Sequence, residues 1–177
     1  PQEFIQMPRR REQKSGKYLL PPLELLESDR GTPSSGDIKA NANIIRRTLQ
    51  NFGIEVEMTE VNIGPSVTQY TFKPAEGVKL SRITALQNDL SLALAAHSLR
   101  IEAPIPGRSL VGIEIPNRSI SLVGLRSLLS SDEFQKNPSP LPFVLGRDVT
   151  GSAVYADLSR MPHLLIAGAT GTGKSIA

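Results

Sequence analysis

One stretch near the end of the sequence constrains the fold more than any other. It fits the pattern G-x-x-x-x-G-K-[ST] of phosphate-binding loops and reads Gly168-Ala169-Thr170-Gly171-Thr172-Gly173-Lys174-Ser175. The apolar run His163–Ala167 precedes it, as a buried strand of a parallel sheet would. Strand, glycine loop and helix start together predict the beginning of an α/β nucleotide-binding domain; an ordinary glycine-rich turn is the alternative.

The residue types in this loop suit a nucleoside triphosphate. Glycine allows positive φ and brings backbone N–H groups close to phosphate oxygens. Lys174 can reach the β- and γ-phosphates, and the Ser175 hydroxyl can ligate Mg²⁺. A helix starting here would direct its positive dipole end at the anion. We therefore predict ATP and Mg²⁺ as cofactors, Lys174 as catalytic, and all eight residues Gly168 to Ser175 as nucleotide-binding.

Length and composition set outer limits. The 177 residues allow one domain and part of a second, and the lack of cysteine excludes a disulfide framework or a thiolate metal site. No apolar run approaches the ~20 residues that span a bilayer. Because the first residue is Pro1, we expect an internal start, with any membrane anchor upstream.

The net charge of +3 lies in the first 17 residues, which contain Arg9, Arg10, Arg11, Lys14 and Lys17 against two acids. Such a tail suits an anionic partner, and a solvated linker explains it equally well. We interpret residues 1–36 as a basic, partly disordered linker whose short apolar segment 18–26 docks on the following domain.

The middle of the chain predicts an α+β domain. Residues 37–52 form an amphipathic helix with Asp37 as N-cap and Gly53 after its end. Strands 54–63, with one slip in its alternation, and 67–73 form an antiparallel hairpin. A helix over 81–98, capped by Ser81, precedes strands 100–103 and 110–115. The order is α-β-β, then α-β-β.

The chain after this domain is predicted to contain short elements and a domain boundary. One or two short helices are expected over 121–136, with Ser130 and Glu133 as a capping box. Two short paired strands flank Asp148–Ser152. We place a domain boundary near residue 140, so that the domains are 37–138 and 141–177.

Other candidate residues have simpler structural interpretations. His97 and His163 have no ligand at metal-binding spacing, so a helix edge and a strand start explain them. Three carboxylates alternate along an exposed strand face: Glu55, Glu57 and Glu60. Tyr70 and Phe72 are expected in the core. The DNA-binding residues stay unassigned.

Several blocks resemble the FtsK/SpoIIIE family of bacterial DNA translocases. They cover about residues 20 to 177 in correct order and lead into the phosphate loop: Gly64–Tyr70, Pro74–Ile83, Arg100–Gly107, Val111–Asn117, Leu145–Asp148 and Met161–Gly168. One small departure is Thr172, where the family more often has Ser.

The resemblance implies a fold and a function. It implies an α domain at 37–138 and, at 141–177, the truncated start of a RecA-like P-loop β domain. It implies a homo-hexameric ring around double-stranded DNA, driven by ATP hydrolysis during bacterial cell division. It also implies that the chain is a cytoplasmic portion of a protein anchored upstream in the inner membrane at the septum.

Two other functions remain open at this stage. The chain alone is expected to be inactive as an ATPase, so as an isolated piece it is a non-catalytic ring-forming and DNA-guiding module. Another ring-forming P-loop ATPase, such as a conjugation-type DNA pump, is the remaining alternative; the blocks Gly64–Tyr70 and Ile101–Gly107 speak against it.

Overall fold

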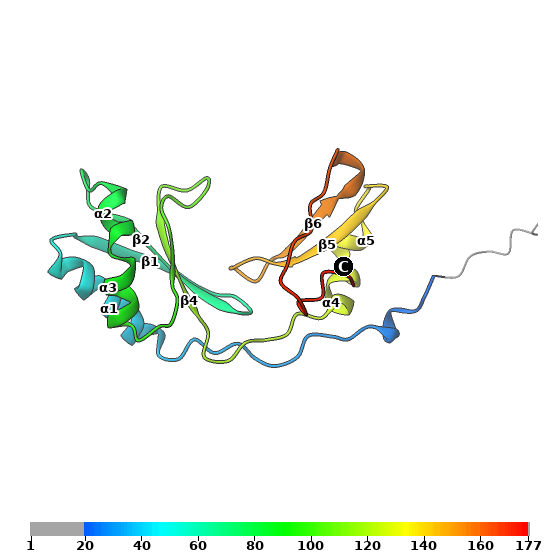
Figure 1. Cartoon of the computed structure of the whole chain (residues 1–177), viewed down its shortest axis with the longest axis horizontal. Coiled ribbons are helices and arrows are strands. Elements are labelled where there is room, and N and C mark those ends of the chain that lie inside the picture. Colours follow the sequence, from blue (N-terminus) through cyan, green and yellow to red (C-terminus); the bar gives the residue numbers. More distant parts are fainter. Residues whose placement is uncertain (1–19, 177) are drawn as a thin grey trace, which may run out of the picture.

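The computed structural model describes residues 20–176, which form two lobes joined by a narrow ribbon (Figure 1). The basic residues of the predicted tail, within 1–17, lie outside the described part of the chain. Among residues 20–176, no helix combines the length and the apolarity that crossing a lipid bilayer requires.

The first lobe is a four-stranded antiparallel sheet with three helices. The strands lie in the order β1-β2-β4-β3. Their bounds are β1 (Val56–Ile63), β2 (Val67–Pro74), β3 (Arg100–Glu102) and β4 (Val111–Pro116). The helices are α1 (Ile38–Asn51), α2 (Leu80–Ala85) and α3 (Gln87–Ala93). The mixed α/β class and the α-β-β-α-β-β order are thereby confirmed, with the second helix in two pieces.

Helix α1 begins and ends where its sequence predicts. The Asp37 carboxylate accepts a hydrogen bond of 2.9 Å from the Ala40 N–H, which caps the first turn. Gly53 follows the helix with φ of +69°, a conformation that glycine adopts without steric cost. Ile45 and Leu49 point into the core and are fully buried.

Strands β1 and β2 form the predicted hairpin, and the slip in the β1 pattern is a bulge between Met58 and Val61. The Thr71 hydroxyl occupies this irregularity. It accepts from the Glu60 N–H at 3.0 Å and donates to the Glu60 carbonyl at 3.0 Å. The bulge thus keeps its backbone groups satisfied.

The prediction of one helix over 81–98 is wrong in three respects. The helix is broken at Leu86, where ψ is 12°, so that α2 ends at Ala85 and α3 begins at Gln87. Helix α3 ends at Ala93 rather than at residue 98. Lys79 rather than Ser81 is the N-cap of α2, without a side-chain hydrogen bond. The break redirects the chain, and α3 packs beside α1.

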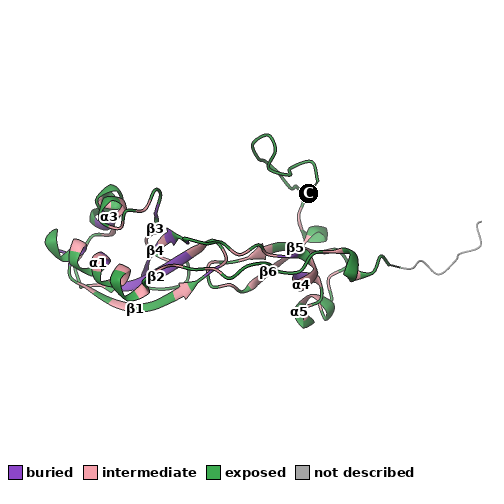
Figure 2. Cartoon of the chain, turned by 90° about the horizontal axis from the view of Figure 1, so that it is seen from below, coloured by how far each residue is buried: buried purple, intermediate pink, exposed green. Residues whose placement is uncertain are grey.

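The core lies between the helices and one face of the sheet (Figure 2). Tyr70 and Phe72 on β2 are fully buried in it, as predicted. The other large side chains that lose all or nearly all exposure are Ile45, Leu49, Ile54, Ile83, Leu90, Leu99, Val111 and Ile113.

The second lobe is the hairpin of β5 (Pro142–Arg147) and β6 (Ala153–Asp157), with α4 (Leu125–Leu129) and α5 (Asp132–Gln135) packed on it. The pairing of the two strands confirms the prediction. Ser131, not Ser130, caps α5 by accepting from the Phe134 N–H. Ser130 instead donates to the Arg126 carbonyl one turn earlier. The predicted capping box of Ser130 and Glu133 therefore does not form, because Ser131 is the cap and Phe134 stands three residues after it.

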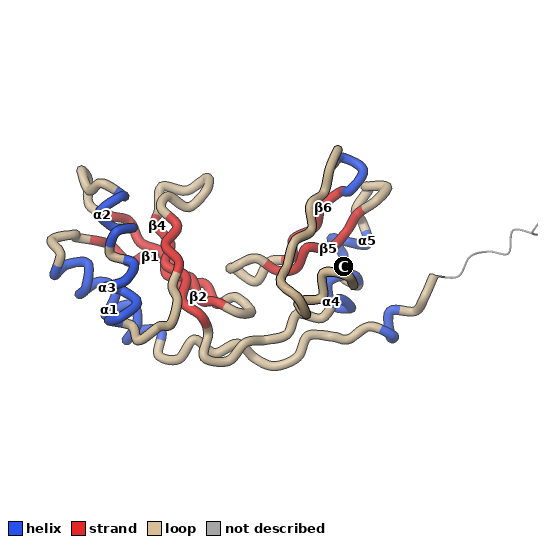
Figure 3. The backbone as a smooth tube through the Cα atoms, in the orientation of Figure 1, coloured by secondary structure: helices blue, strands red, loops and turns tan. Residues whose placement is uncertain are grey.

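The ribbon between the lobes consists of two antiparallel segments (Figure 3). Arg30 bridges Leu122, and Ser34 bridges Ser119. The short 3₁₀ turn η1 (Leu23–Leu25) contacts α4, so the segment before the ribbon touches the second lobe. The division of the chain at residue 140 stays a prediction for the intact protein; the packing of α4 and α5 on β5–β6 favours a boundary within the ribbon, near residues 118–124.

The strand predicted at His163–Ala167 does not form. These residues follow the 3₁₀ turn η2 (Leu158–Arg160) as exposed, unpaired backbone, with Leu165 89% exposed. A parallel strand needs neighbours on both sides and layers on both faces. The described residues place no strand beside it, so its apolar side chains gain nothing from adopting that conformation.

Candidate functional site

The loop Gly168–Ser175 lies on the surface at the end of the described chain, drawn in the exposed colour in Figure 2. Gly171 and Gly173 have φ values of +85° and +86°, which few other residues adopt. The Thr172 hydroxyl donates to the Ala169 carbonyl at 2.7 Å and holds the loop in a turn. The predicted helix after Lys174 is a single turn here, in which the Ile176 N–H donates to the Gly173 carbonyl.

The residues of the loop fit a nucleoside triphosphate in their chemistry. They line an open hollow of about 360 Å³, and Lys174 and Ser175 both border it. A Cβ atom on Gly168 would lie 2.5 Å from the Thr172 hydroxyl oxygen, so a larger residue there would require the Thr172 side chain to rotate away from the Ala169 carbonyl. Among residues 168–175, only the Thr172 N–H has a described backbone acceptor, and the other N–H groups of the loop remain available to an anion.

The histidines and glutamates named in the sequence analysis do not come together to form another site. His97 is exposed near the end of α3, and His163 is exposed before the unpaired segment. No group of three or more metal-ligating side chains occurs in the described part of the chain. Glu60 pairs with Arg108 at 2.8 Å, and this ion pair holds the pKa of the Glu60 carboxyl below its usual value.

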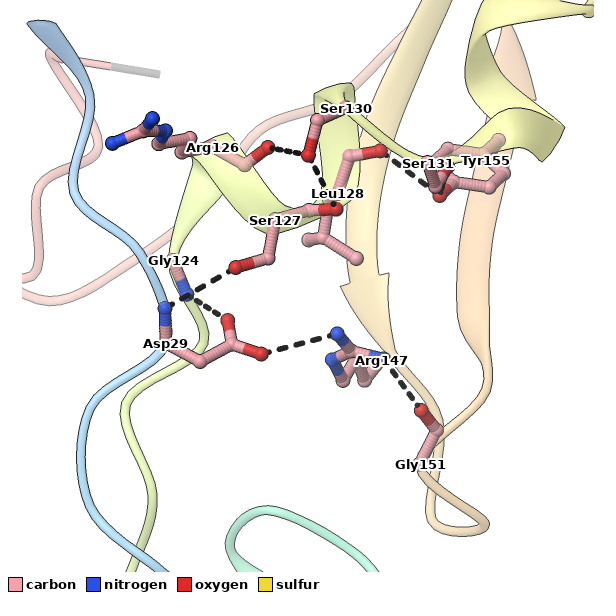
Figure 4. Close-up of polar contacts among 10 residues, drawn as sticks. All are labelled: Asp29, Gly124, Arg126, Ser127, Leu128, Ser130, Ser131, Arg147, Gly151 and Tyr155. Carbon is pink, nitrogen blue, oxygen red and sulfur yellow. Dashed lines mark hydrogen bonds and ion pairs between the residues drawn. The ribbon is translucent and has the colours of Figure 1, made fainter. Parts of the chain in front are cut away.

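A polar cluster around Asp29 ties the ribbon to the second lobe (Figure 4). Its carboxylate accepts from the Gly124 N–H at 2.7 Å and from the Arg147 guanidinium at 3.1 Å. The Asp29 N–H donates to the Ser127 hydroxyl, and Arg147 also donates to the Gly151 carbonyl. The Gly124 N–H, with smaller help from Ser127 and Arg147, lowers the pKa of Asp29.

Gly124 is required by this cluster. A Cβ atom there would lie 2.3 Å from the carbonyl carbon of Ser28, closer than any real contact, so only glycine lets the two segments meet. Sequence patterns could not reveal the cluster, because Asp29 lies 95 residues from Gly124 and 118 from Arg147. The one available signal was the block Leu145–Asp148, whose structural role could not be inferred from its residues alone.

The turn of the β5–β6 hairpin makes a second contact between the lobes. Asp148 accepts from the Thr150 hydroxyl and from the N–H groups of Thr150 and Ser152, and these bonds lower its pKa. The turn so formed brings the Val149 carbonyl oxygen against the β1–β2 turn. A Cβ atom on Gly64 would lie 2.8 Å from that oxygen. The second lobe therefore reaches the first at two places, the ribbon and this turn.

The fold and the loop define a class: a mixed α/β protein that carries a phosphate-binding loop motif after a small antiparallel hairpin. Comparison with known proteins gives the family. A family model described as the FtsK alpha domain matches residues 20–117, and a model described as the FtsK/SpoIIIE family matches residues 124–177. The chain belongs to the FtsK/SpoIIIE family.

Curated relatives agree with this family. The chain is 49% identical over 168 residues to a DNA translocase FtsK of Sporosarcina ureae, covering 93% of the chain and 22% of the relative. It is 48% identical over 167 residues to a DNA translocase FtsK of Caldanaerobacter subterraneus, covering 93% of the chain and 24% of the relative. The chain thus spans about a fifth to a quarter of the length of these relatives.

Among solved structures, the chain is similar to the conjugation coupling protein TcpA of pCW3, solved as a monomer form with ATPγS. The identity is 20% and the TM-score 0.36, with 77% of this chain and 39% of that chain covered. A similarity this weak carries no argument about function.

Proposed function

We propose that this chain is part of an ATP-driven double-stranded DNA translocase, a homo-hexameric ring motor that moves chromosomal DNA during bacterial cell division. The observation that carries the proposal is the ordered match of two FtsK family models, the second of which contains the loop Gly168–Ser175. The names of the relatives, DNA translocases FtsK, support the same activity. In this proposal residues 37–138 are the motor α domain and 141–177 begin the ATPase domain.

In the proposed motor the loop binds ATP and Mg²⁺. The N–H groups around Gly171 and Gly173 donate to phosphate oxygens, because the positive φ of both glycines turns the backbone and their lack of a side chain leaves the approach open. Lys174 neutralises charge on the β- and γ-phosphates, and the Ser175 hydroxyl ligates Mg²⁺. Hydrolysis of the bound nucleotide supplies the free energy for movement along DNA.

The proposed surroundings of the motor follow from the same family membership. The chain is a cytoplasmic portion of a longer protein that is anchored upstream in the inner membrane at the septum. Its partners are double-stranded DNA and further copies of itself. Fluorescence of a tagged full-length protein in dividing cells tests this placement, and a uniform cytoplasmic signal would contradict it.

Replacing Lys174 with Ala tests the motor directly. In a full-length protein that carries these residues, we expect Lys174→Ala to reduce DNA-stimulated ATP hydrolysis at least about a hundredfold, because the principal cation facing the transferred phosphate is lost. Phosphate release is measured with and without duplex DNA.

The matched control is Thr172→Ser, which keeps a hydroxyl able to donate to the Ala169 carbonyl. This variant should retain near-normal turnover. Unchanged turnover in Lys174→Ala would remove Lys174 from the site and, with it, the motor role of this loop.

A second candidate function applies to the chain taken alone: a non-catalytic module that forms rings and guides DNA. It is favoured by the contrast between the closed core of the first lobe and the unpaired segment that leads into the loop. We expect no DNA-dependent ATP hydrolysis from residues 1–177 in a phosphate-release assay. Measurable turnover by the purified chain would refute this second function and leave the first intact.

A further inference from the structure

The charges of the first lobe are divided between its two layers, although residues 37–117 carry equal numbers of basic and acidic side chains. The helical layer, with the turns that open its helices, is basic: Lys39, Arg46, Arg47, Lys79 and Arg82 stand against Asp37 and Asp89. The strands and their turns are acidic: Glu55, Glu57, Glu60, Glu76, Glu102 and Glu114 stand against Lys73, Arg100 and Arg108. A neutral lobe thus has two faces of opposite charge.

The basic face is centred on α1. Lys39, Asn43, Arg46 and Gln50 recur at the spacing that puts them on one stripe of the helix, with Arg47 beside it, and all five are exposed. The stripe lies away from Ile45 and Leu49, which face the core. Within residues 20–176, no basic side chain of α1 forms an ion pair.

The acidic face is on the opposite side of the lobe. Tyr70 and Phe72 point toward the helices, so alternation places Lys73 on the other face of β2. Glu57 pairs with Lys73 across the strands and shares that face. Glu55, Glu57 and Glu76 line an open hollow of about 370 Å³ there, in which Lys73 is the only basic lining residue.

We propose that the α1 face of one copy docks on the acidic β1–β2 face of the next copy, head to tail. The proposal rests on the ring-forming function proposed above and names the surfaces that meet. Two different, complementary patches on opposite faces of one subunit give a heterologous contact, which closes into a ring or continues as a filament. Opposite potentials steer the encounter and fix its register.

Exposed apolar side chains on the helical layer add contact area to this interface. Leu92 on α3 is 84% exposed, and Phe52 at the end of α1 is 45% exposed. Burial of such side chains supplies affinity that surface charge pairs alone lack.

The observations favour a second copy over duplex DNA as the occupant of the basic face. A duplex would use the basic side chains for its phosphates and leave the acidic face without a role. The head-to-tail contact uses both faces and accounts for the neutrality of the lobe as a whole.

A charge-swap experiment on residues 1–177 tests this interface by sedimentation equilibrium. The helix-reversed variant carries Arg46→Glu and Arg47→Glu, and the sheet-reversed variant carries Glu55→Lys and Glu57→Lys. At about 0.01 M salt, where screening extends to ~30 Å, we expect wild-type self-association that weakens on adding salt. Each variant alone should associate about tenfold or more weakly, because both of its faces then carry one sign.

Mixing the two variants restores opposite signs at every contact of an alternating assembly, so association should return to near the wild-type level. The control for the helix-reversed variant, Lys136→Glu with Arg160→Glu, lowers the net charge by the same amount at exposed positions outside the first lobe and should associate as the wild type does. Circular dichroism melting checks that every variant is folded.

Three outcomes would overturn the proposal: no self-association of the wild type at low salt, equal loss in the control, or no recovery on mixing. If the helix-reversed variant loses duplex DNA affinity while its self-association is unchanged, the basic face binds DNA instead. Because sedimentation requires neither ATP nor DNA, failure here leaves the translocase function standing. An unaffected Lys174→Ala turnover would contradict that function without altering the sedimentation result.

Discussion

Asn117 shows how a single buried side chain holds the turn of the β1–β2 hairpin. It accepts from the Thr68 hydroxyl at 2.6 Å and donates to the Gly64 carbonyl at 2.8 Å, and both bonds are buried. Gly64 lies in the β1–β2 turn, which also contacts the Val149 carbonyl of the second lobe. One amide therefore fixes the start of β2 and the shape of the surface that the second lobe contacts.

Replacing Asn117 with Ala leaves the Thr68 hydroxyl and the Gly64 carbonyl without their partner. We expect the free energy of unfolding to fall by about 1–3 kcal/mol, the usual cost of unsatisfied buried polar groups. Urea denaturation followed by circular dichroism measures it. Thr68→Val in the Asn117→Ala background removes one of the orphaned groups and should recover part of the loss; a further loss of similar size would contradict this account.

The elements differ in how well local sequence defines them. Helix α1 and the β1–β2 hairpin carry their own caps, turn and alternation, so their bounds were predictable to within about two residues. The second helix was not, because its break at Leu86 has no glycine or proline to mark it. The apolar run His163–Ala167 has the composition of a strand, but pairing partners decide whether a strand forms, and those are not local.

The contrast between these elements predicts their hydrogen exchange. Amides of β2, such as those of Tyr70 and Phe72, lie in a sheet between β1 and β4 and should exchange slowly. Those of Leu164–Ala167 have no described backbone partner and should exchange at close to the rate of an unstructured peptide. Mass spectrometry or NMR after transfer to D₂O measures both; strong protection at Leu164–Ala167 would show that the segment is paired in solution.

The residues of the phosphate-binding loop could be predicted from the sequence, but the contacts between distant segments elsewhere in the structure could not. The spacing of Gly168, Gly173 and Lys174 identifies the loop, because the backbone chemistry of phosphate binding depends on those residue types. The Asp29 cluster, by contrast, depends on three segments that meet only after folding. No pattern of neighbouring residues encodes such a meeting.

At the scale of the whole molecule, the Asp29 cluster predicts how acid affects the link between the lobes. The pKa of Asp29 in the folded chain lies below its ordinary value of 3.8. Because the pKa is lowered, the ionised carboxylate stabilises the fold at pH values above the ordinary pKa. This contribution is lost as the pH falls through the pKa of the folded state. The Asp29 side chain is 42% exposed, so solvent screening keeps the contribution small.

We therefore expect the wild type to be more stable than Asp29→Asn at about pH 6, with a difference that shrinks as the pH falls below 3.8. Denaturation curves of both proteins across this range measure it. In an Arg147→Gln background the Gly124 N–H still donates to the carboxylate, so part of the difference should persist. A difference between wild type and Asp29→Asn that is constant with pH would rule out this linkage.

The ribbon also shows the order in which the chain passes through the two lobes. The polypeptide touches α4 at η1, leaves along one side of the ribbon, builds the first lobe, and returns along the other side to build α4 itself. Ser34 and Ser119 exchange both backbone hydrogen bonds, at 3.0 and 3.3 Å, and so face each other as the last pair of a hairpin would. The first lobe is thus an insertion whose two ends lie side by side at Ser34 and Ser119, so a turn of about two residues between these serines is geometrically sufficient to take its place.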